Sequence, residues 1–501
     1  MSGIKKLAGQ TMWYGVSSIA ARFLNYLITP YLTEVLSREN YGKMSLVYSV
    51  LPFLNILFTY GMETAFFRFS NNGENKNTIY NTTATSILIS TICFGATLLL
   101  FHHQLAEFAG IGNYPELIKL SIFIIMIDTL TIIPFAKLRY DGRPVKYAMA
   151  KISGILAYII FTYFFLSVCY LHAKEDPTSF YAKLVDTSRN PVYYIVLANL
   201  IQAVVTLAFL YKELLAIRLK IDMKLWWQII VYSIPLIIVG MGGVINETMD
   251  RIMLKWWIPG TEDFKDAQVG IYGACYKLSI LISLFVQAFR MGAEPFFFKQ
   301  AGSENPQRIY ARVMKFFVIV ICMMFLVVAL YINIWKYFIA DKLWEGLAIV
   351  PILLLANMFL GIYYNLSIWY KLGNKTMAGA WITLSGALIT ITINYFFIPR
   401  YGYMACAWAT FICYGSMMVF SFIWGQKEYR VPYAWKKLVA YIVIAVLLFF
   451  INKGISIYIN NIWTGYAVAT ILLLLYTGFI AQIEKKELEH LPVVGKYFSV
   501  K

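Results

Sequence analysis

The sequence predicts an all-α integral membrane protein, and three observations support this class. Of the 501 residues, 60% are hydrophobic and only 14% are charged, whereas soluble domains carry about 25% charged residues. The mean hydropathy is +0.65. The hydrophobic residues fall into runs of about 20, the length at which an α-helix crosses the hydrocarbon core of a bilayer. A soluble globular protein is therefore excluded.

These runs define about 14 expected transmembrane helices. Most are bounded by Gly, Pro, Asn or charged residues, and the longest loop, 171–190, is too short for a soluble domain. Lys5 and Lys6 precede the first run, which lacks a small-residue cleavage pattern and is expected to be a retained span. The expected spans are 11–31, 44–64, 81–101, 116–136, 148–170, 191–211, 227–250, 269–293, 313–334, 346–369, 379–398, 403–424, 438–458 and 463–482.

Most of the 43 lysines and arginines fall in loops on the same side of the membrane as the N-terminus. Because loops rich in Lys and Arg stay in the cytoplasm, we expect both chain ends to be cytoplasmic. The net charge of +17 then mainly sets the topology. The basic residues of functional interest are those within or beside spans, namely Arg22, Lys119, Arg251, Lys277 and Arg290.

An internal repeat divides the chain. Two short segments recur at the same offset of 231 residues, Tyr41-Gly42 as Tyr272-Gly273 and Gly61-Met62-Glu63 as Gly292-Ala293-Glu294. Spans 1–6 and 7–12 therefore look like two copies that start on the same side of the membrane. We expect two six-helix lobes related by a pseudo-two-fold axis along the membrane normal, with a central cleft between them. The expected N-terminal lobe is 1–222 and the C-terminal lobe 223–430, while 431–501 adds two helices and a tail.

Several classes of chemistry lack the residues they need. The six cysteines form no CxxC pair, and the four histidines have no metal-binding spacing such as HExxH. The sequence also has no GxxxxGKS/T phosphate-binding loop. A disulfide framework, a metal centre and a built-in ATPase are therefore not supported. We expect no cofactor and no enzymatic activity.

Polar side chains follow one face of four expected helices. A charge at the bilayer centre costs about 2.5–3.5 kcal/mol on insertion scales, so it should face a wet cavity or a partner. In spans 1, 2, 7 and 8 the stripes are Ser18, Arg22, Asn25 and Thr29; Ser45, Ser49, Pro52, Asn55, Thr59 and Glu63; Ser233, Gly240, Glu247 and Arg251; and Tyr276, Ser283, Gln287, Arg290 and Glu294. Because the repeat relates spans 1 and 2 to spans 7 and 8, we expect the stripes to line one cleft.

Some of these charges have a second interpretation. Asp250 and Arg251 either face the cleft or pair with each other, and Asp128 is either an ion carrier or a buried acid bonded to a neighbouring helix. Charges near the cytoplasmic helix ends can form gate salt bridges or snorkel to the interface. The expected gate residues are Glu63, Arg68, Glu294 and Lys299.

Span 7 contains an expected hinge. Gly240, Gly242 and Gly243 follow Pro235 within this one helix. Glycine and proline weaken a helix, as alternating access requires. The alternative is that the glycines permit close packing against a neighbouring helix.

Three segments carry a family resemblance: Leu36-Ser37-Arg38-Glu39-Asn40-Tyr41-Gly42, then Gly61-Met62-Glu63 with Arg68, then Asp250-Arg251-Ile252-Met253-Leu254 followed by Val269-Gly270-Ile271-Tyr272. On these residues the chain resembles the multidrug/oligosaccharidyl-lipid/polysaccharide exporter superfamily, and within it the bacterial flippases for O-antigen-type polysaccharide repeat units. The resemblance implies transport of an undecaprenyl-pyrophosphate-linked oligosaccharide across the bacterial cytoplasmic (inner) membrane. It also implies arginines in the central cavity and a groove at spans 13–14 for the lipid tail.

The resemblance gives the cleft residues expected roles in alternating access. The expected pyrophosphate- and sugar-binding residues are Arg22, Asn25, Arg251, Lys277, Gln287 and Arg290. The expected carriers of a coupling H⁺ or Na⁺ are Asp128, Glu247 and Asp250. Expected partners are the lipid-linked oligosaccharide, membrane lipids and polysaccharide-assembly proteins, with no nucleic acid.

Two other functions remain open from the sequence. A cation-coupled multidrug exporter of the same superfamily would need cavity carboxylates without a competing arginine, and span 1 offers Arg22 and no mid-span acid. A membrane-embedded glycan polymerase or ligase usually presents catalytic residues on a large extracytoplasmic loop. The longest loop here has about 20 residues and no clear acid/base pair.

Overall fold

The computed structural model describes residues 19–20, 22–70, 75–373, 375–458 and 461–488, and these residues form helices without any strand. Thirteen helices in this part of the chain are long and apolar enough to cross a membrane, and they coincide with expected spans 2–14. Expected span 1 lies largely outside the described residues, although 22–27 are helical and α2 follows at Thr29–Val35. The all-α membrane fold predicted from the sequence is confirmed.

The helices of the N-terminal lobe are α3 (Arg38–Thr59), α4 (Met62–Ser70), α5 (Lys76–Leu100), α6 (His102–Phe108), α7 (Pro115–Tyr140), α8 (Pro144–Tyr163), a π-helical turn (Phe164–Cys169), α9 (Tyr170–Glu175), α10 (Phe180–Leu184), α11 (Val192–Phe209) and α12 (Tyr211–Leu215). The next group contains α13 (Met223–Trp257), α14 (Glu262–Gln300), α15 (Pro306–Ala329), α16 (Ile332–Trp335), the 3₁₀ segments Lys336–Phe338 and Asp341–Ile349, α17 (Val350–Leu366), α18 (Ile368–Leu372), α19 (Thr376–Tyr401) and α20 (Tyr403–Glu428). The chain ends with α21 (Trp435–Ser456), α22 (Ile462–Ile483) and α23 (Lys485–Leu488).

Local sequence signals set where these helices begin and break. Ser37, Asp222 and Thr261 accept hydrogen bonds from backbone N–H groups at the starts of α3, α13 and α14. Proline occupies the first turn of α7, α8 and α15, where its missing N–H is not needed. Tyr60 and Gly61 adopt the left-handed conformation, with φ of 33° and 73°, and this break separates α3 from α4.

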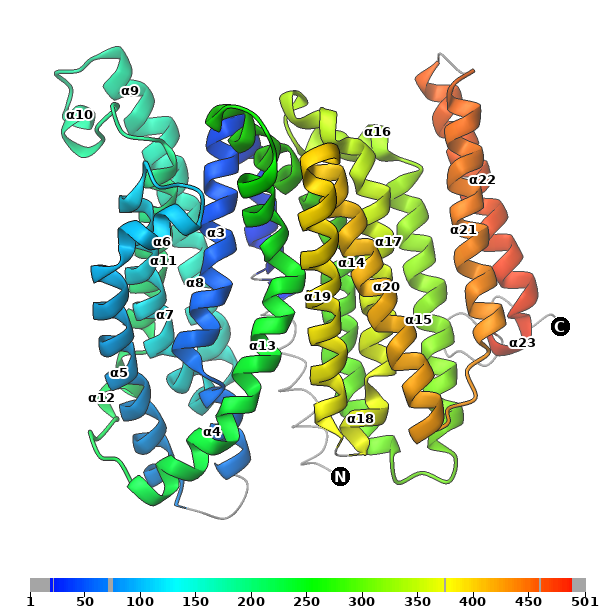
Figure 1. The fold of residues 1–501 in the computed structure, drawn as a ribbon, viewed down its shortest axis with the longest axis horizontal. Helices are drawn as coiled ribbons and strands as arrows, with labels where there is room; N and C mark the ends of the chain where they lie inside the picture. The colour runs from blue at the N-terminus through cyan, green and yellow to red at the C-terminus, as the bar shows by residue number, and fades with distance from the viewer. Residues whose placement is uncertain (1–18, 21, 71–74, 374, 459–460, 489–501) are drawn as a thin grey trace.

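The repeat is visible in the helices. Lys76 and Pro306, which begin α5 and α15, are 230 residues apart, and Pro144 and Thr376, which begin α8 and α19, are 232 residues apart. Corresponding helices also have corresponding neighbours, since α3 packs on α7 as α14 packs on α17, and α8 packs on α11 as α19 packs on α20. Figure 1 shows the two groups of helices side by side.

The two ends of the bundle differ in their loops. We call the end that carries α4, α12 and α18 the basic end, because most of the loop lysines and arginines lie there. The opposite end carries α6, α10 and α16 (Figure 1). The basic end is the side that the sequence assigns to the cytoplasm, and this orientation stays a prediction.

Helix α13 connects the lobes along its length. At the basic end, Leu225 and Ile229 pack in one apolar cluster with Met62 of α4. Further along, the Asn246 side chain donates to the Thr383 carbonyl of α19 (3.1 Å). Figure 1 shows α13 curving from one group of helices to the other. This helix is therefore positioned to transmit movement between the lobes.

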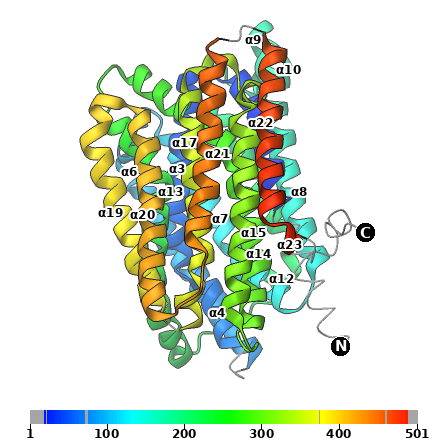
Figure 2. The same cartoon turned by 90° about the vertical axis from the view of Figure 1, so that its right-hand side faces the viewer.

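Helices α21 and α22 form a pair beside α15 (Figure 2). Their basic ends are held by the carboxylate of Glu484, which is 2% exposed and pairs with Lys315 (2.9 Å) and Lys437 (2.5 Å). The Tyr441 hydroxyl also donates to Glu484 (2.5 Å). This buried charge cluster fixes the C-terminal pair to the C-terminal lobe.

Candidate functional site

Two cavities lie beside α13 and adjoin at Glu247. The first, which we call the apical cavity, has a volume of about 330 Å³ and is lined by both lobes. The C-lobe cavity, of about 370 Å³, is lined by α13, α14 and α17–α20. The polar residues of the apical cavity include Asn25, Ser45, Ser49, Asn199, Gln202, Glu247, Arg251 and Lys277. Parts of all four expected stripes therefore meet, since Asn25, Ser45, Arg251 and Tyr276 come from spans 1, 2, 7 and 8.

Arg251 is held against the cavity wall by its own helix. Its guanidinium donates to the Asp250 carboxylate (3.1 Å) and to the Glu247 carbonyl (2.9 Å), and it lies over the ring of Tyr276 (4.4 Å). The other oxygen of Asp250 accepts a hydrogen bond from the Tyr272 hydroxyl. Asp250 is therefore the buried partner of Arg251 and lines neither cavity, and its expected role as an ion carrier stays a prediction.

Lys277 is the second cation of the apical cavity. Its side chain is half-buried on α14, one turn beyond Gly273. Among the described residues it has no ion-pair or hydrogen-bond partner. Because a half-buried ammonium group without a counter-ion is costly, this position favours an anionic ligand.

Span 1 contributes at the edge of the described residues. Arg22 is exposed and donates a hydrogen bond to the Gln287 side chain of α14. Asn25 lies one turn further along and lines the apical cavity. Arg22 and Gln287, which the sequence assigned to one cleft, are thus in contact, although neither lines the apical cavity itself.

Arg290 lines the C-lobe cavity rather than the apical one. It donates to Glu294 (2.8 Å), one turn further along α14, and lies over the ring of Tyr364 (4.7 Å). Lys371 of α18 also donates to Glu294 (2.5 Å). Tyr363, Tyr364, Tyr370 and Tyr414 line the same cavity.

Two of the four expected gate residues, Glu63 and Glu294, form ion pairs inside their own lobes. Arg139 of α7 pairs with Glu63 of α4, and Lys371 pairs with Glu294. The guanidinium of Arg68 lies over the ring of Tyr232 in α13 (4.2 Å). Lys299 is exposed, and within the described ranges it has no partner. Asp128 is half-buried in α7 and lines neither cavity.

The three glycines of α13 have different surroundings, and the helix is unbroken here. A Cβ atom on Gly240 would lie 3.1 Å from Ile56, and one on Gly242 would lie 3.3 Å from Leu384 and Thr383. A Cβ atom on Gly243 would meet nothing within 4 Å. Close packing therefore accounts for Gly240 and Gly242, while the role of Gly243 as a hinge stays a prediction.

Sequence reasoning missed several polar residues of the lobes, two of which, Lys371 and Asn246, line the C-lobe cavity. Arg139 and Lys371 were not selected, although the repeat offset places them within one position of each other. The buried amides of Asn246 and Asn394 were also missed, and each has an oxygen without a hydrogen-bond partner among the described residues. A search for polar residues at repeat-related positions would have found the first pair.

The fold and the cleft define a class of two-lobed, all-helical membrane proteins. The structure resembles that of the lipid II flippase MurJ in an inward closed conformation, with a TM-score of 0.71 and 12% identity over 94% of this chain and 99% of that chain. It also resembles an inward-facing multidrug resistance MATE family transporter of the MOP superfamily, with a TM-score of 0.62 and 13% identity over 81% of this chain and 94% of that one. At such identities the likeness shows the fold.

A family model described as polysaccharide biosynthesis protein matches residues 7–300, which is more than half of the chain. The chain therefore belongs to the polysaccharide biosynthesis protein family, a membership that agrees with the resemblance seen in its motifs. Its fold is that of the flippases and transporters of the MOP superfamily. A search of curated protein sequences found no match.

Proposed function

We propose that this protein is a flippase that moves an undecaprenyl-pyrophosphate-linked oligosaccharide repeat unit across the cytoplasmic membrane by alternating access, for the synthesis of a surface polysaccharide. The observation that carries the proposal is the cation in the apical cavity that has no counter-ion among the described residues; the other charged residues of this cavity are Arg251, which is paired with Asp250, and Glu247. Arg251 and Lys277 line it from two helices, and Lys277 has no counter-ion among the described residues. An anion entering this cavity would supply that missing partner.

The pyrophosphate is the part of such a substrate that is hardest to move through a membrane. Its charged oxygens need donors that replace water, and basic side chains provide the strongest hydrogen bonds for this purpose. Asp250 and Tyr276 hold the Arg251 guanidinium group in place. Its remaining N–H donors therefore already have a fixed orientation when the pyrophosphate arrives. Arg22, one turn from Asn25, would serve as a further donor at the cavity edge.

The C-lobe cavity suits the sugar part of the substrate. Four tyrosines, Tyr363, Tyr364, Tyr370 and Tyr414, offer rings and hydroxyl groups along its wall. Aromatic faces pack against the apolar faces of sugar rings, while hydroxyl groups pair with those of the sugars. Arg290 lies over one of these rings and is already paired with Glu294. We therefore assign Arg290 to the sugar end and Arg251 with Lys277 to the pyrophosphate end.

Glu247 is our preferred carrier for a coupling H⁺ or Na⁺. Its side chain is exposed, and it lines both cavities, so an ion can reach it from either one. Asp250 has both carboxylate oxygens engaged, and Asp128 lies outside the cavities. An ion bound to Glu247 would neutralise its carboxylate and so weaken the attraction between Glu247 and Arg251. The net charge of the apical cavity around the pyrophosphate would then become more positive.

Flipping of a fluorescent lipid-linked oligosaccharide in reconstituted vesicles tests the proposal. We expect Lys277→Gln to slow flipping by on the order of tenfold, because a hydrogen bond to a charged group is lost. Lys265→Gln, on the exposed start of α14, is the matched control and should flip at the wild-type rate. Arg22→Ala should also be slower than wild type.

Equal flipping by Lys277→Gln and wild-type vesicles would contradict the assignment of Lys277. Export of ethidium without lipid flipping would favour the multidrug exporter instead. A cationic drug would meet the positive charges of Arg251 and Lys277 in the same cavity, and like charges repel in a medium of low dielectric constant. We therefore rank the exporter second.

A further inference from the structure

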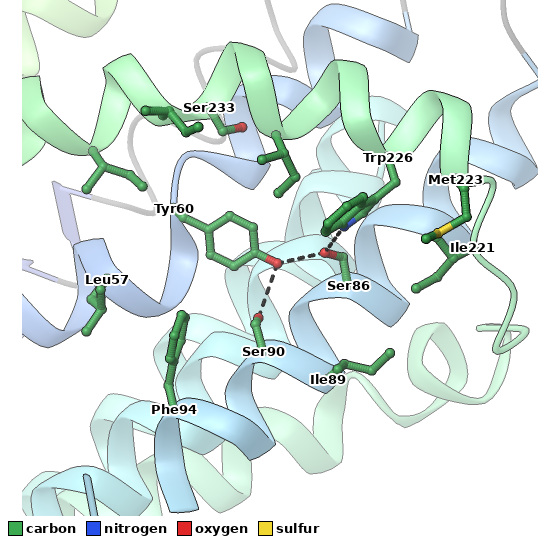
Figure 3. Close-up of a pocket in the computed structure, with 13 residues that line it drawn as sticks. Leu57, Tyr60, Ser86, Ile89, Ser90, Phe94, Ile221, Met223, Trp226 and Ser233 are labelled. Atoms are coloured by element: carbon green, nitrogen blue, oxygen red, sulfur yellow. Dashed lines mark hydrogen bonds between the residues drawn. The ribbon is translucent and has the colours of Figure 1, made fainter. Parts of the chain in front are cut away.

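A third cavity lies on the outer side of α13, where α13 and α5 diverge. This α5–α13 crevice has a volume of about 430 Å³ and an almost entirely apolar lining. Leu57 and Tyr60 lie behind it, Phe94 closes its inner part, and Ile89 and Ile234 at its rim are about half exposed. Figure 3 shows these side chains around an open space between the helices. The crevice therefore faces the surroundings of the bundle.

The shape of the crevice matches one hydrocarbon chain of one leaflet. Along α13 its lining extends from Met223 through Ile230 to Ile237, about 21 Å at 1.5 Å per residue. The hydrocarbon of a single leaflet is about 15 Å thick. The crevice begins at the basic end, because Ile221 and Met223 lie at the start of α13. An acyl chain of the leaflet at that end would fit along it.

The crevice is separated from the substrate cleft by α13 itself. Leu236 and Val239 line the C-lobe cavity from the other face of the helix. Two close contacts seal the seam, since a Cβ atom on Gly61 would lie 2.9 Å from Leu236 and one on Gly240 would lie 3.1 Å from Ile56. A chain in the crevice therefore belongs to a lipid other than the substrate in the cleft.

The polar groups that line the crevice are hydrogen-bonded to one another, with the exception of Ser233. The Trp226 indole donates to Ser86 (2.8 Å), and the Tyr60 hydroxyl bonds to Ser86 (2.8 Å) and accepts from Ser90 (3.1 Å). The Ser233 hydroxyl is 1% exposed, lines the crevice and has no hydrogen-bond partner among the described residues. Ser233 lies about 15 Å along α13 from Met223 at the mouth, so it would lie beside the far part of an acyl chain and not beside its head group.

The mouth of the crevice is positively charged. Lys220 and Lys224 are exposed and directly flank Ile221 and Met223 of the lining. The loop that carries them is fixed to α5, because the backbone N–H of Asp222 donates to Thr82 (3.1 Å). The carboxylate of Asp222 is itself occupied in capping α13. The mouth thus offers an anionic head group two exposed ammonium groups on a backbone that is fixed to α5.

We propose that the α5–α13 crevice is a binding site for an anionic phospholipid. One acyl chain lies in the crevice, and Lys220 and Lys224 bind the phosphate group at its mouth. The lipid fills the space between α5 and the first half of α13, so it supports the attachment of α13 to the N-terminal lobe.

Native mass spectrometry of the full chain in detergent tests the charge of the site. We expect dioleoyl-phosphatidylglycerol to bind more tightly than dioleoyl-phosphatidylcholine. The double variant Lys220→Gln/Lys224→Gln should weaken phosphatidylglycerol binding by roughly tenfold, since each basic residue near a membrane surface adds attraction for anionic lipid. Lys427→Gln/Lys436→Gln changes two exposed lysines at the same end, away from the crevice, and should bind like wild type.

Crosslinking tests the place of the acyl chain. A phosphatidylglycerol with a photoreactive group in one chain should label residues 86–94 and 223–237. Ile89→Trp at the rim should abolish that label, whereas Ile92→Trp, equally exposed on α5 but outside the lining, should keep it. Equal binding of the two phospholipids, an unchanged label in Ile89→Trp, or displacement of the label by undecaprenyl phosphate would overturn the proposal.

Discussion

The two ends of the helix bundle join the lobes in different ways. At the opposite end, α3 and α14 cross in backbone contact. A Cβ atom on Gly42 would lie 1.9 Å from the Asp266 carbonyl, and one on Gly270 would lie 2.1 Å from the Arg38 carbonyl. At the basic end, the ion pairs of Glu63 and Glu294 stay inside their own lobes. The opposite end therefore joins the lobes through close backbone contact, whereas the basic end joins them through side-chain packing of α13 on α4 and no ion pair between the lobes among the described residues.

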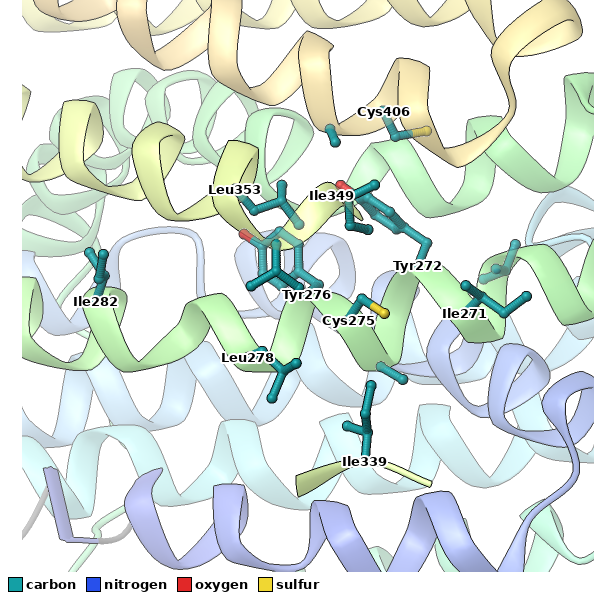
Figure 4. Close-up of a cluster of buried hydrophobic side chains, with 14 of the residues drawn as sticks. Ile271, Tyr272, Cys275, Tyr276, Leu278, Ile282, Ile339, Ile349, Leu353 and Cys406 are labelled. Carbon is teal, nitrogen blue, oxygen red and sulfur yellow. The ribbon is translucent and has the colours of Figure 1, made fainter. Parts of the chain in front are cut away.

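Charge and apolar packing reinforce the contact at the opposite end. Inside the C-terminal lobe, Lys255 of α13 is 4% exposed and pairs with Asp266 (2.6 Å) and Glu262 (2.9 Å) of α14. Between the lobes, Lys43 of α3 lies 3.9 Å from the same Asp266 carboxylate. Behind this layer α14 packs its apolar face on α17 and α20, with Tyr272 in the centre (Figure 4). If the protein works by alternating access, this contact is the one that must separate.

The largest loss of stability should come from removing the buried ammonium group of Lys255. Lys255→Met leaves the buried carboxylate of Asp266 with a distant partner only, so we expect the free energy of unfolding to fall by about 3 kcal/mol. Thermal unfolding in detergent measures the change. Lys265→Met removes the other partner of Glu262, whose side chain is 65% exposed, and should cost under about 1 kcal/mol. Equal losses in the two variants would show that the buried Asp266 carboxylate does not depend on Lys255.

Smaller changes in the free energy of unfolding should come from replacing two glycines with alanine, and the two changes should have opposite signs. Gly42→Ala places a methyl group against the α14 backbone and should destabilise the protein by about 2 kcal/mol. Gly243→Ala adds its methyl group to open space and should stabilise α13 by up to about 1 kcal/mol. Unfolding midpoints decide the signs. Slower flipping by a more stable Gly243→Ala protein would support its role as a hinge.

At the basic end we expect still smaller and independent effects. Glu63→Gln and Glu294→Gln each break a partly exposed pair, worth about 1 kcal/mol or less. Because the two pairs lie in separate lobes, the double variant should lose the sum of the two single losses within about 0.5 kcal/mol. A double-mutant cycle on unfolding free energies measures this. A larger coupling would mean that the pairs do connect the lobes.

The sequence predicted the fold better than the site, for physical reasons. Burial in lipid requires long apolar runs, so spans 2–14 could be read directly, and a shared offset revealed the repeat. Helical periodicity also brought Asn25, Arg251 and Tyr276 to one cavity. Side-chain contacts between two different helices follow no such period in the sequence. The pairing of Tyr272 with Asp250 therefore needed the three-dimensional fold.

The same limit applies to the tight seam between α3 and α14. Gly42 and Gly270 are ordinary helical glycines in the sequence, and only the crossing of their helices makes them irreplaceable. The α5–α13 crevice was missed for a similar reason, because Ser233 belongs to the same stripe as Glu247 yet faces the other side of a curved helix. A stripe of polar residues predicts a shared helix face over a few turns only. When a helix curves over a longer distance, as α13 does, residues of the same stripe face different surroundings.

The smallest expected effect is a pH dependence at the basic end, where the C-terminal helix pair is anchored. Burial alone would raise the pKa of the Glu484 carboxyl, but hydrogen bonds from Lys437, Tyr441 and Lys315 outweigh it and hold the pKa below its ordinary value. A carboxyl with a lowered pKa stabilises the folded state above its ordinary pKa, and this contribution disappears as the pH falls through the lowered value. Glu484→Gln should therefore be less stable than wild type by on the order of 1 kcal/mol at pH 7.

The difference between wild type and Glu484→Gln should shrink steadily as the pH is lowered from 5 towards 3, because the wild-type carboxyl then becomes neutral as well. Thermal unfolding of both proteins across this range measures it. Glu428→Gln, which breaks the pair with Lys375 at the same end, is the control and should show a small difference at every pH, since that pair is more exposed. A gap that stays constant down to pH 3 would mean that Glu484 anchors the helices by shape rather than by charge.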